Sequence, residues 1–346
     1  MRSITRSLTG RPRHARWRVP RLAALVGGTL VLAGLVVAAP SGAATPVTTN
    51  AGAASVTTAG GAYPVGDAAT GYLAELTDPT GSPPGVNLSG CHPAASGPQQ
   101  YPVILLPGTL YDMADTWQAL GPILADDGWC VYGLNYGATI STTLSGDRIW
   151  SVGDIPTSAG QLATFVGQAL AATGASKVDL VGWSQGGMMP RWYLRFDGGA
   201  AHVHDLVGLA PSNHGTTVDG TSALFDAVTT LGLPAPLTLA ECPACTQQLA
   251  GSAFLQQLNA GRDTVPGVRY TVIETGGDEV VTPYTSAFLS GPAVRNVTLQ
   301  DQCPDDHADH LAMPYHSAAL QDVVQALDDA PSFSVDCGLG LPVLGG

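Results

Sequence analysis

Short runs of branched apolar residues alternate along the chain with stretches whose apolar positions recur at helical spacing. The runs predict six strands, at residues 102–106, 130–134, 178–181, 205–210, 268–275 and 296–300. The helical spacing predicts helices at residues 117–126, 158–172, 187–196 and 317–327. Strands that alternate with helices in this way are typical of a mostly parallel sheet flanked by helices. We therefore expect an α/β fold.

Residues 217–262 interrupt the alternation. Their apolar periodicity is weak, and they contain three prolines and two closely spaced cysteines. A long segment of this kind between two strands of a parallel sheet is where a lid or a wall of the substrate pocket is found. We therefore expect a lid-like insert over the strand ends.

The N-terminus has the layout of a signal peptide. Residues 1–21 carry seven arginines and no acid, an apolar run follows at 22–39, and small residues at 41–44 offer a cleavage site. The alternative is a permanent membrane anchor, which an apolar run of this length could nearly provide. We expect a signal peptide at 1–44, a low-complexity and partly ordered leader at 45–90, and the folded domain at 91–346.

Removal of the signal peptide changes the charge of the chain. It takes away half of the 14 basic residues and none of the 27 acids, which leaves seven basic residues and a net charge of −20. Such a chain repels nucleic acid and anionic membrane surfaces, so nucleic-acid binding is excluded. We expect a secreted, extracellular monomer with no stable insertion in the membrane after cleavage.

Six cysteines in an exported chain predict three disulfides, for which 15 pairings are possible. Cys242 and Cys245 form a Cys-Pro-Ala-Cys motif that can be a redox or a metal half-site. It has no second cysteine pair and no thioredoxin-like surroundings, so a local structural bridge is the favoured interpretation. The other four lie toward the two ends of the domain: Cys91, Cys130, Cys303 and Cys337.

The strand at 178–181 runs into the motif Gly182-x-Ser184-x-Gly186. This spacing predicts a strained strand-to-helix turn that exposes the Ser184 hydroxyl as a nucleophile. The backbone N–H group of Gln185 then points to the place where an oxyanion forms. A second oxyanion donor is expected at Thr109, in the glycine-bearing turn after the first strand. The alternative for both motifs is ordinary turn chemistry.

An acid and a base are expected further along the chain. Asp278 follows the strand at 268–275, where the carboxylate of a serine hydrolase belongs; Glu274 and Glu279 are weaker candidates. Chain order places the base at one of the next histidines, His307 or His310, and the spacing from Cys303, together with the resemblance described below, favours His310. His214 precedes every candidate acid, so we interpret it as a structural or pocket-rim residue.

The acids and histidines between residues 305 and 310 have the side chains of a metal site. Their spacing does not place them on one face of a helix, and a solvated acidic loop is the simpler interpretation. The expected chemistry needs no metal and no organic cofactor.

With these residues assembled, the chain resembles the secreted bacterial class 2 lipases, which have the α/β-hydrolase fold. The resemblance covers about residues 91–329. Seven motifs carry it: Leu106–Thr109, Gly182–Gly187, Ala210–Thr216, Cys242–Cys245, Gly251–Phe254, Asp278–Val281 and Asp309–Leu311.

The resemblance implies that Ser184 is the nucleophile, Asp278 the acid and His310 the base. It places the oxyanion donors on the backbone of Thr109 and Gln185. Two positions depart from the bacterial pattern, because Pro107 and Trp183 stand where histidines are usual. Both resemble the fungal lipase B group and leave substrate preference and interfacial activation open.

The cysteine placement also resembles the lipase B group. It implies the pairs Cys91–Cys130 and Cys303–Cys337.

Together, these features predict a triacylglycerol lipase that acts through an acyl-enzyme on lipid or other ester substrates and binds transiently at lipid–water interfaces. A short-chain carboxylesterase, a polyester hydrolase or an acyltransferase can use the same residues. A non-catalytic binding protein with a hydrolase fold is the alternative from another class of function. Peptidase activity is less favoured, because nothing in the sequence suggests a peptide-reading groove.

Overall fold

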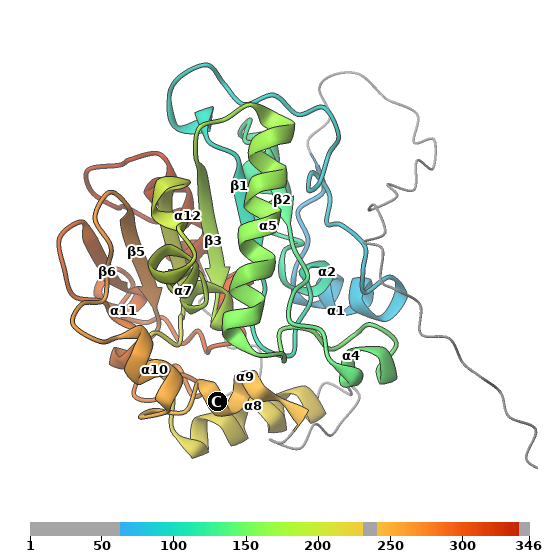
Figure 1. Cartoon of the computed structure of the whole chain (residues 1–346), viewed down its shortest axis with the longest axis vertical. Helices are drawn as coiled ribbons and strands as arrows, with labels where there is room; N and C mark the ends of the chain where they lie inside the picture. Colours follow the sequence, from blue (N-terminus) through green and yellow to red (C-terminus); the bar gives the residue numbers. More distant parts are fainter. Residues whose placement is uncertain (1–62, 231–240, 339–346) are drawn as a thin grey trace, which may run out of the picture. The chain divides into compact units, whose positions relative to one another are not determined.

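A six-stranded sheet forms the centre of the protein in a computed structural model that describes residues 63–230 and 241–338. The strand order is β2-β1-β3-β4-β5-β6, and every neighbouring pair is parallel (Figure 1). The strands are β1 (Val103–Leu106), β2 (Val131–Gly133), β3 (Val178–Trp183), β4 (Val203–Leu209), β5 (Arg269–Glu274) and β6 (Val294–Thr298). All six lie where the apolar runs predicted strands.

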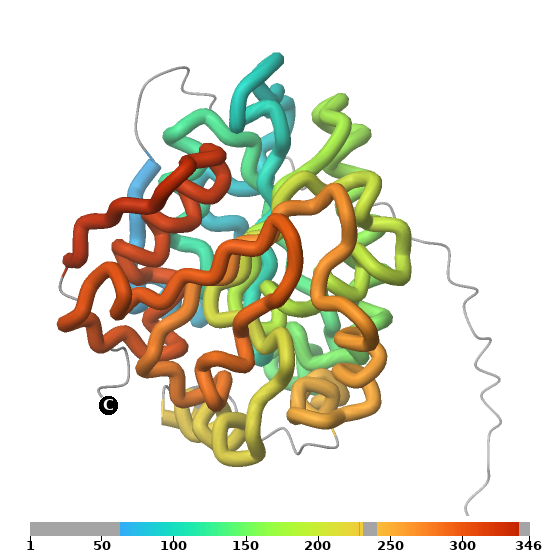
Figure 2. The backbone as a smooth tube through the Cα atoms, turned by 90° about the vertical axis from the view of Figure 1, so that its left-hand side faces the viewer, coloured from blue at the N-terminus to red at the C-terminus, as the bar shows by residue number. Residues whose placement is uncertain are grey.

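Helices cover both faces of the sheet. Helices α5 (Ile155–Thr173) and α7 (Pro190–Phe196) pack against each other on one face, and α3 (Leu120–Asp126) and α12 (Ser317–Leu327) lie on the other (Figure 2). Every residue of β1 and β3 is therefore buried. Burial on both faces explains why these strands read as continuous apolar runs and not as alternating ones.

Capping residues determine where α5, the helix that leads to β3, begins and ends. The Asp154 carboxylate accepts a hydrogen bond from the backbone N–H of Thr157, and Pro156 occupies the first turn, where a missing N–H group has no cost. Gly174 ends the helix with a left-handed φ of 72°, which glycine adopts without strain.

Residues before Cys91 contribute a helix to the same compact unit as the sheet. Helix α1 (Ala68–Thr77) packs against α2 (Met113–Thr116), which follows β1. The sequence predicted only partial order here. Helix α1 shows little amphipathic pattern in the sequence, because the residues that it buries are Gly71 and Glu75 and not a stripe of aliphatic side chains.

Among its described residues, the expected insert forms three α-helices, α8 (Val218–Thr230), α9 (Pro243–Gln247) and α10 (Ala253–Leu258). They lie beyond the arrowhead of β3, at the carboxyl end of the sheet (Figure 1). Residues 231–240 of the insert lie outside the described residues, as does the predicted signal peptide. Among the residues that are described, no helix is long and apolar enough to cross a membrane.

Some predicted boundaries differ from the observed ones. The helix expected from residue 117 begins at Leu120, because Trp117 ends α2. The helical stretch expected at 187–196 is α6 (Gln185–Met188) followed by α7, which begins at Pro190. The last strand ends at Thr298, and α11 (Leu299–Gln302) starts at once. Helix α4 (Ile140–Leu144) was not expected.

Three disulfides are formed, with the pairs that the resemblance implied at the two ends of the domain. Cys91–Cys130 joins the segment before β1 to the start of β2, and Cys303–Cys337 joins the end of α11 to the segment after α12. Cys242–Cys245 is a local bridge at the start of α9. The described part of the chain has no free cysteine.

Candidate active site

Ser184 occupies the sharp turn between β3 and α6. Its φ of 55° and ψ of −121° are rarely adopted by a residue with a side chain. A Cβ atom on Gly182 would collide with the backbone of Gly186, and one on Gly186 would collide with the carbonyl groups of Leu106 and Pro107. The two glycines therefore let the chain turn closely enough to hold Ser184 at the end of a central strand.

A buried polar network surrounds the expected oxyanion donors. The Thr109 hydroxyl donates to Gln185 Oε1 over 2.7 Å, and Gln248 Nε2 donates to Thr109 Oγ1 over 2.8 Å. The same Gln248 nitrogen lies 3.1 Å from Gln185 Oε1, and Ser212 Oγ donates to Gln248 Oε1 over 2.7 Å. Gln248 thus connects the side chains of the two residues that are expected to carry the oxyanion donors.

Asp278 and His310 lie together at the carboxyl end of the sheet. His310 Nδ1 is 2.7 Å from Asp278 Oδ2, and both side chains are fully buried. The other oxygen, Asp278 Oδ1, accepts from the backbone N–H groups of Val280 and Val281 over 2.8 and 2.6 Å. These bonds fix the carboxylate and leave Nε2 as the nitrogen that His310 can turn toward a substrate.

The surroundings favour the protonated form of His310. Burial lowers the pKa of this imidazole, but the charge and hydrogen bond of Asp278, with Glu279 and Asp309 adding to them, raise the pKa above the ordinary 6.5. Burial, together with the nearby Asp278 charge, raises the pKa of Glu274 well above its usual range. The raised pKa favours the neutral form of Glu274, which makes it a weaker partner for the imidazole.

Trp183, which precedes Ser184 in the chain, contacts His310 at the carboxyl end of the sheet. The indole N–H of Trp183 donates to the His310 carbonyl over 3.1 Å, and the two rings lie 5.3 Å apart. His310 Nε2 is buried and has no hydrogen-bond partner among the described residues. Hydrogen bonds between a nucleophile and its base often tighten only when substrate binds.

A cavity of about 20 Å³ borders Ser184. Side chains of the insert close it, with Thr221 and Leu224 from α8, Cys245 from α9, and Gln248 just after α9. This space holds about one water molecule. The insert therefore forms the wall of the space beside Ser184 in the observed conformation.

The other histidines considered from the sequence lie apart from this cluster. His214 is held by the Ser286 carbonyl and the Asp263 carboxylate, a structural arrangement. His307 is exposed to solvent. In the same loop, Asp306 binds the N–H of Ala308 and pairs with His316. This acidic loop therefore builds a turn before His310.

Sequence reasoning missed Gln248 and Glu75, both buried polar residues close to the site. Gln248 follows the Cys242–Cys245 motif by three residues, and no spacing rule connects it to Thr109. Glu75 lies in a segment assigned to a leader. The only available signal for it in the sequence was a single acid in residues 68–77, which contain several alanines; its burial is visible only in the structure.

A second group of charged residues lies at the opposite ends of the strands. Asp179, His204 and Asp205 offer three potential metal ligands close to one another. Arg269 already binds both oxygens of Asp205 and also pairs with Asp329. The group therefore already has a cation in Arg269, and among the described residues Asp179 Oδ2 is left without a hydrogen-bond partner.

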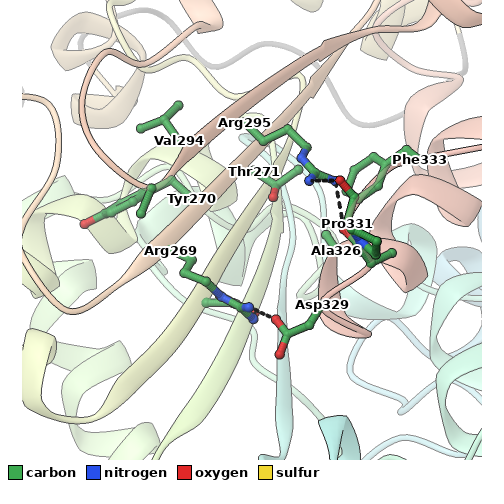
Figure 3. A pocket seen from close by; sticks show the side chains of 12 residues that line it. Arg269, Tyr270, Thr271, Val294, Arg295, Ala326, Asp329, Pro331 and Phe333 are labelled. Carbon is green, nitrogen blue, oxygen red and sulfur yellow. Dashed lines mark hydrogen bonds and ion pairs between the residues drawn. The ribbon is translucent and has the colours of Figure 1, made fainter.

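Arg269 also lines a cavity of about 290 Å³ (Figure 3). Across this cavity, Arg295 donates to the carbonyl groups of Ala330 and Pro331 and stacks over the Phe333 ring at 4.1 Å. These contacts fasten the C-terminal segment to β5 and β6.

The parallel sheet, its helical faces and the strained turn after β3 define an α/β-hydrolase fold. Residues 100–322 match the family model described as Lipase (class 2), which spans more than half of the chain. The protein belongs to this family, whose members are carboxylic ester hydrolases.

Two relatives are similar to the chain. Lipase B of Pseudozyma antarctica is 25% identical over 203 residues, which cover 57% of this chain and 51% of that protein. The crystal structure of Aspergillus fumigatus lipase B superposes with a TM-score of 0.54 at 23% identity, over 78% of this chain and 66% of that one. The chain spans about half the length of the curated relative that it matches.

Proposed function

We propose that this protein is a secreted serine ester hydrolase that cleaves triacylglycerols through an acyl-enzyme on Ser184. The observation that carries the proposal is the pairing of a strained Ser184 turn with a buried Asp278–His310 hydrogen bond of 2.7 Å at the same end of the sheet. Membership of the class 2 lipase family supports the same chemistry.

In the proposed mechanism, Ser184 Oγ attacks the ester carbonyl carbon and His310 Nε2 accepts the hydroxyl proton. Asp278 holds the imidazole and stabilises its charged form. The backbone N–H groups of Thr109 and Gln185 donate to the oxyanion, a contribution on the order of 3 kcal/mol for each donor. His310 then gives the proton to the leaving alcohol, and water cleaves the acyl-enzyme by the same route.

Two observations support secretion. All cysteines of the described chain are paired in disulfides, which persist in oxidising compartments. Residues 1–44 have the sequence layout of a signal peptide. N-terminal sequencing of the exported protein tests this proposal, and a mature chain that begins before residue 40 would contradict it.

The small cavity beside Ser184 favours a second candidate, a short-chain carboxylesterase. With about 20 Å³ between Ser184 and α8, a long acyl chain requires Thr221 and Leu224 to move. Lipase activity on long-chain emulsions therefore implies that α8 shifts when substrate binds.

Hydrolysis of a p-nitrophenyl ester series, beside tributyrin and olive-oil emulsions, tests both candidates. We expect activity that Ser184→Ala lowers by at least about 10⁴-fold without unfolding the protein. Activity on long-chain emulsions identifies a lipase, and activity confined to short soluble esters identifies an esterase. Activity on none of them, with no labelling of Ser184 by a fluorophosphonate, would reject ester hydrolysis.

A further inference from the structure

A second cavity, of about 220 Å³, lies beside the proposed catalytic residues. Trp183 and Leu311 line it, and these are the chain neighbours of Ser184 and His310. The leaving alcohol of an ester takes its proton from His310, so it must lie on the His310 side of the site. Because the Trp183 ring lies 5.3 Å from the His310 ring, the cavity is the candidate site for the leaving alcohol.

Four aromatic side chains line this cavity. They come from four separate parts of the chain: Tyr72 from α1, Tyr111 from the segment between β1 and α2, Trp183 from the end of β3, and Tyr315 from the segment before α12. The Tyr111 and Trp183 rings meet edge to face at 4.9 Å. A box of aromatic rings binds quaternary ammonium groups, because the negative ring faces attract a cation that is only weakly hydrated.

Two carboxyl groups also line the cavity, Glu75 and Asp115. Glu75 is 2% exposed, and its Oε1 accepts from Arg148 Nε over 3.0 Å. Its Oε2 has no hydrogen-bond partner among the described residues, and neither does the buried Tyr111 hydroxyl. A buried carboxylate oxygen without a partner is costly, so a ligand that supplies positive charge is favoured there.

The cluster around the cavity carries more acid than base. Asp112, the N-cap residue of α2, and Asp115 both lie near Glu75, and Arg148 pairs with Glu75 alone. Burial raises the pKa of Glu75 to about 7, against the lowering effect of Arg148, and burial raises the pKa of Asp115 to about 8. These groups can therefore ionise near neutral pH when a cation enters.

From this geometry we propose that the cavity binds a small organic ammonium group, and that the preferred substrates are esters of amino alcohols of the choline type. This inference rests on the proposed ester hydrolysis. The ammonium group sits among the four rings with Glu75 and Asp115 beside it, and the ester carbonyl reaches Ser184. The site adds recognition of the alcohol and leaves the chemistry of the acyl-enzyme unchanged.

The test compares two esters of the same short acid with the unmodified enzyme. One is the choline ester, and the other is the 3,3-dimethylbutyl ester, in which a carbon atom replaces the quaternary nitrogen. We expect kcat/KM to be about tenfold or more higher for the choline ester, as a desolvated cation–π site implies. Equal values for the two esters would overturn the proposal.

Glu75→Gln isolates the carboxylate, since glutamine keeps the shape and can still accept from Arg148. We expect this variant to reduce the ratio of the two kcat/KM values by about tenfold. Asp301→Asn removes one exposed charge from α11 as the matched control, and it should leave the ratio unchanged. If the Glu75→Gln variant kept the same ratio of the two kcat/KM values as the unmodified enzyme, the assignment of the site would be contradicted.

A binding measurement separates this inference from the proposed function. Calorimetric titration with tetramethylammonium chloride, against sodium chloride at equal ionic strength, requires no turnover. Saturable heat that Glu75→Gln abolishes supports the site even if neither ester is hydrolysed. Hydrolysis of the dimethylbutyl ester with no tetramethylammonium binding would reject the site and retain the esterase.

Discussion

Gln248 is the residue whose role is least visible in the sequence, because its effect depends on two side chains that are distant along the chain. Its Nε2 donates to Thr109 Oγ1 over 2.8 Å and lies 3.1 Å from Gln185 Oε1. These contacts hold the two residues that carry the proposed oxyanion donors. We therefore expect Gln248 to be a positioning residue that acts through Thr109 and Gln185.

We expect Gln248→Met to lower kcat by roughly tenfold with little change in KM. Less firmly held oxyanion donors weaken the binding of the transition state more than the binding of the substrate. Gln256→Met, on the exposed face of α10, is the matched control. Steady-state kinetics on one soluble ester decides the point. A change confined to KM would mean that Gln248 contacts the substrate and does not position the donors.

The pH dependence of activity should reveal the Asp278–His310 pair. The base must be neutral to accept a proton, and its surroundings raise the His310 pKa above 6.5. Activity should therefore fall as pH decreases through a value above 6.5, and Asp278→Asn should move that midpoint to lower pH while it reduces kcat. A pH profile of kcat/KM measures both effects.

The choice between two histidines tests the same assignment. His310→Ala should abolish activity, whereas His307→Ala should retain most of it, because His307 is exposed and His310 is buried against Asp278. The opposite result would make His307 the base.

At the scale of single elements, we expect helix α8 to limit the space for the acyl chain of a substrate. Leu224 lines the cavity of about 20 Å³ beside Ser184. Leu224→Ala should raise kcat/KM for octanoyl relative to butanoyl esters by several-fold. This increase corresponds to the free energy gained by burying one or two methylene groups of the acyl chain. An unchanged chain-length profile would show that α8 moves away when substrate binds.

The disulfides should differ in what they contribute to stability. Cys303–Cys337 closes a loop with a sequence separation of 34, against 3 for Cys242–Cys245. Chain-entropy arguments assign about 4 kcal/mol to the long loop and about 2 kcal/mol to the short one. Denaturant unfolding of the two double-alanine variants should show the larger loss for Cys303 and Cys337.

The sequence was most informative where one element carries its own signal. The apolar runs located all six strands, and the Gly182-x-Ser184-x-Gly186 motif located the strained turn. It was least informative for α1, whose buried face consists of Gly71 and Glu75 and therefore shows no amphipathic pattern. Contacts such as that of Gln248 with Thr109 exist only after the insert has folded over the strand ends.

At the scale of the whole molecule, buried acids should make stability depend on pH. Burial raises the pKa of Asp112 and Asp115 to about 8 and that of Glu75 to about 7. A carboxyl whose pKa is higher in the folded than in the unfolded protein stabilises the fold at low pH. That contribution is fully present below the unfolded pKa of about 4, and it is lost progressively as pH rises from there through the folded values of 7 to 8.

We therefore expect the Tm to fall by more than about 5 °C between pH 6 and pH 9. Asp115→Asn, which keeps the side chain neutral, should reduce the fall. Differential scanning calorimetry across this range measures both. A Tm that rises toward pH 9 would mean that these carboxyl groups are ionised in the folded protein.

The order of the strands along the chain also determines when the protein becomes chemically competent during its synthesis. The turn that holds Ser184 follows β3, but the proposed base follows β6, which is the last strand along the chain. A nascent or truncated chain can therefore form the whole nucleophile turn and still lack any base to activate it. Under the proposed mechanism, ester cleavage therefore begins only after the last strand has joined the sheet.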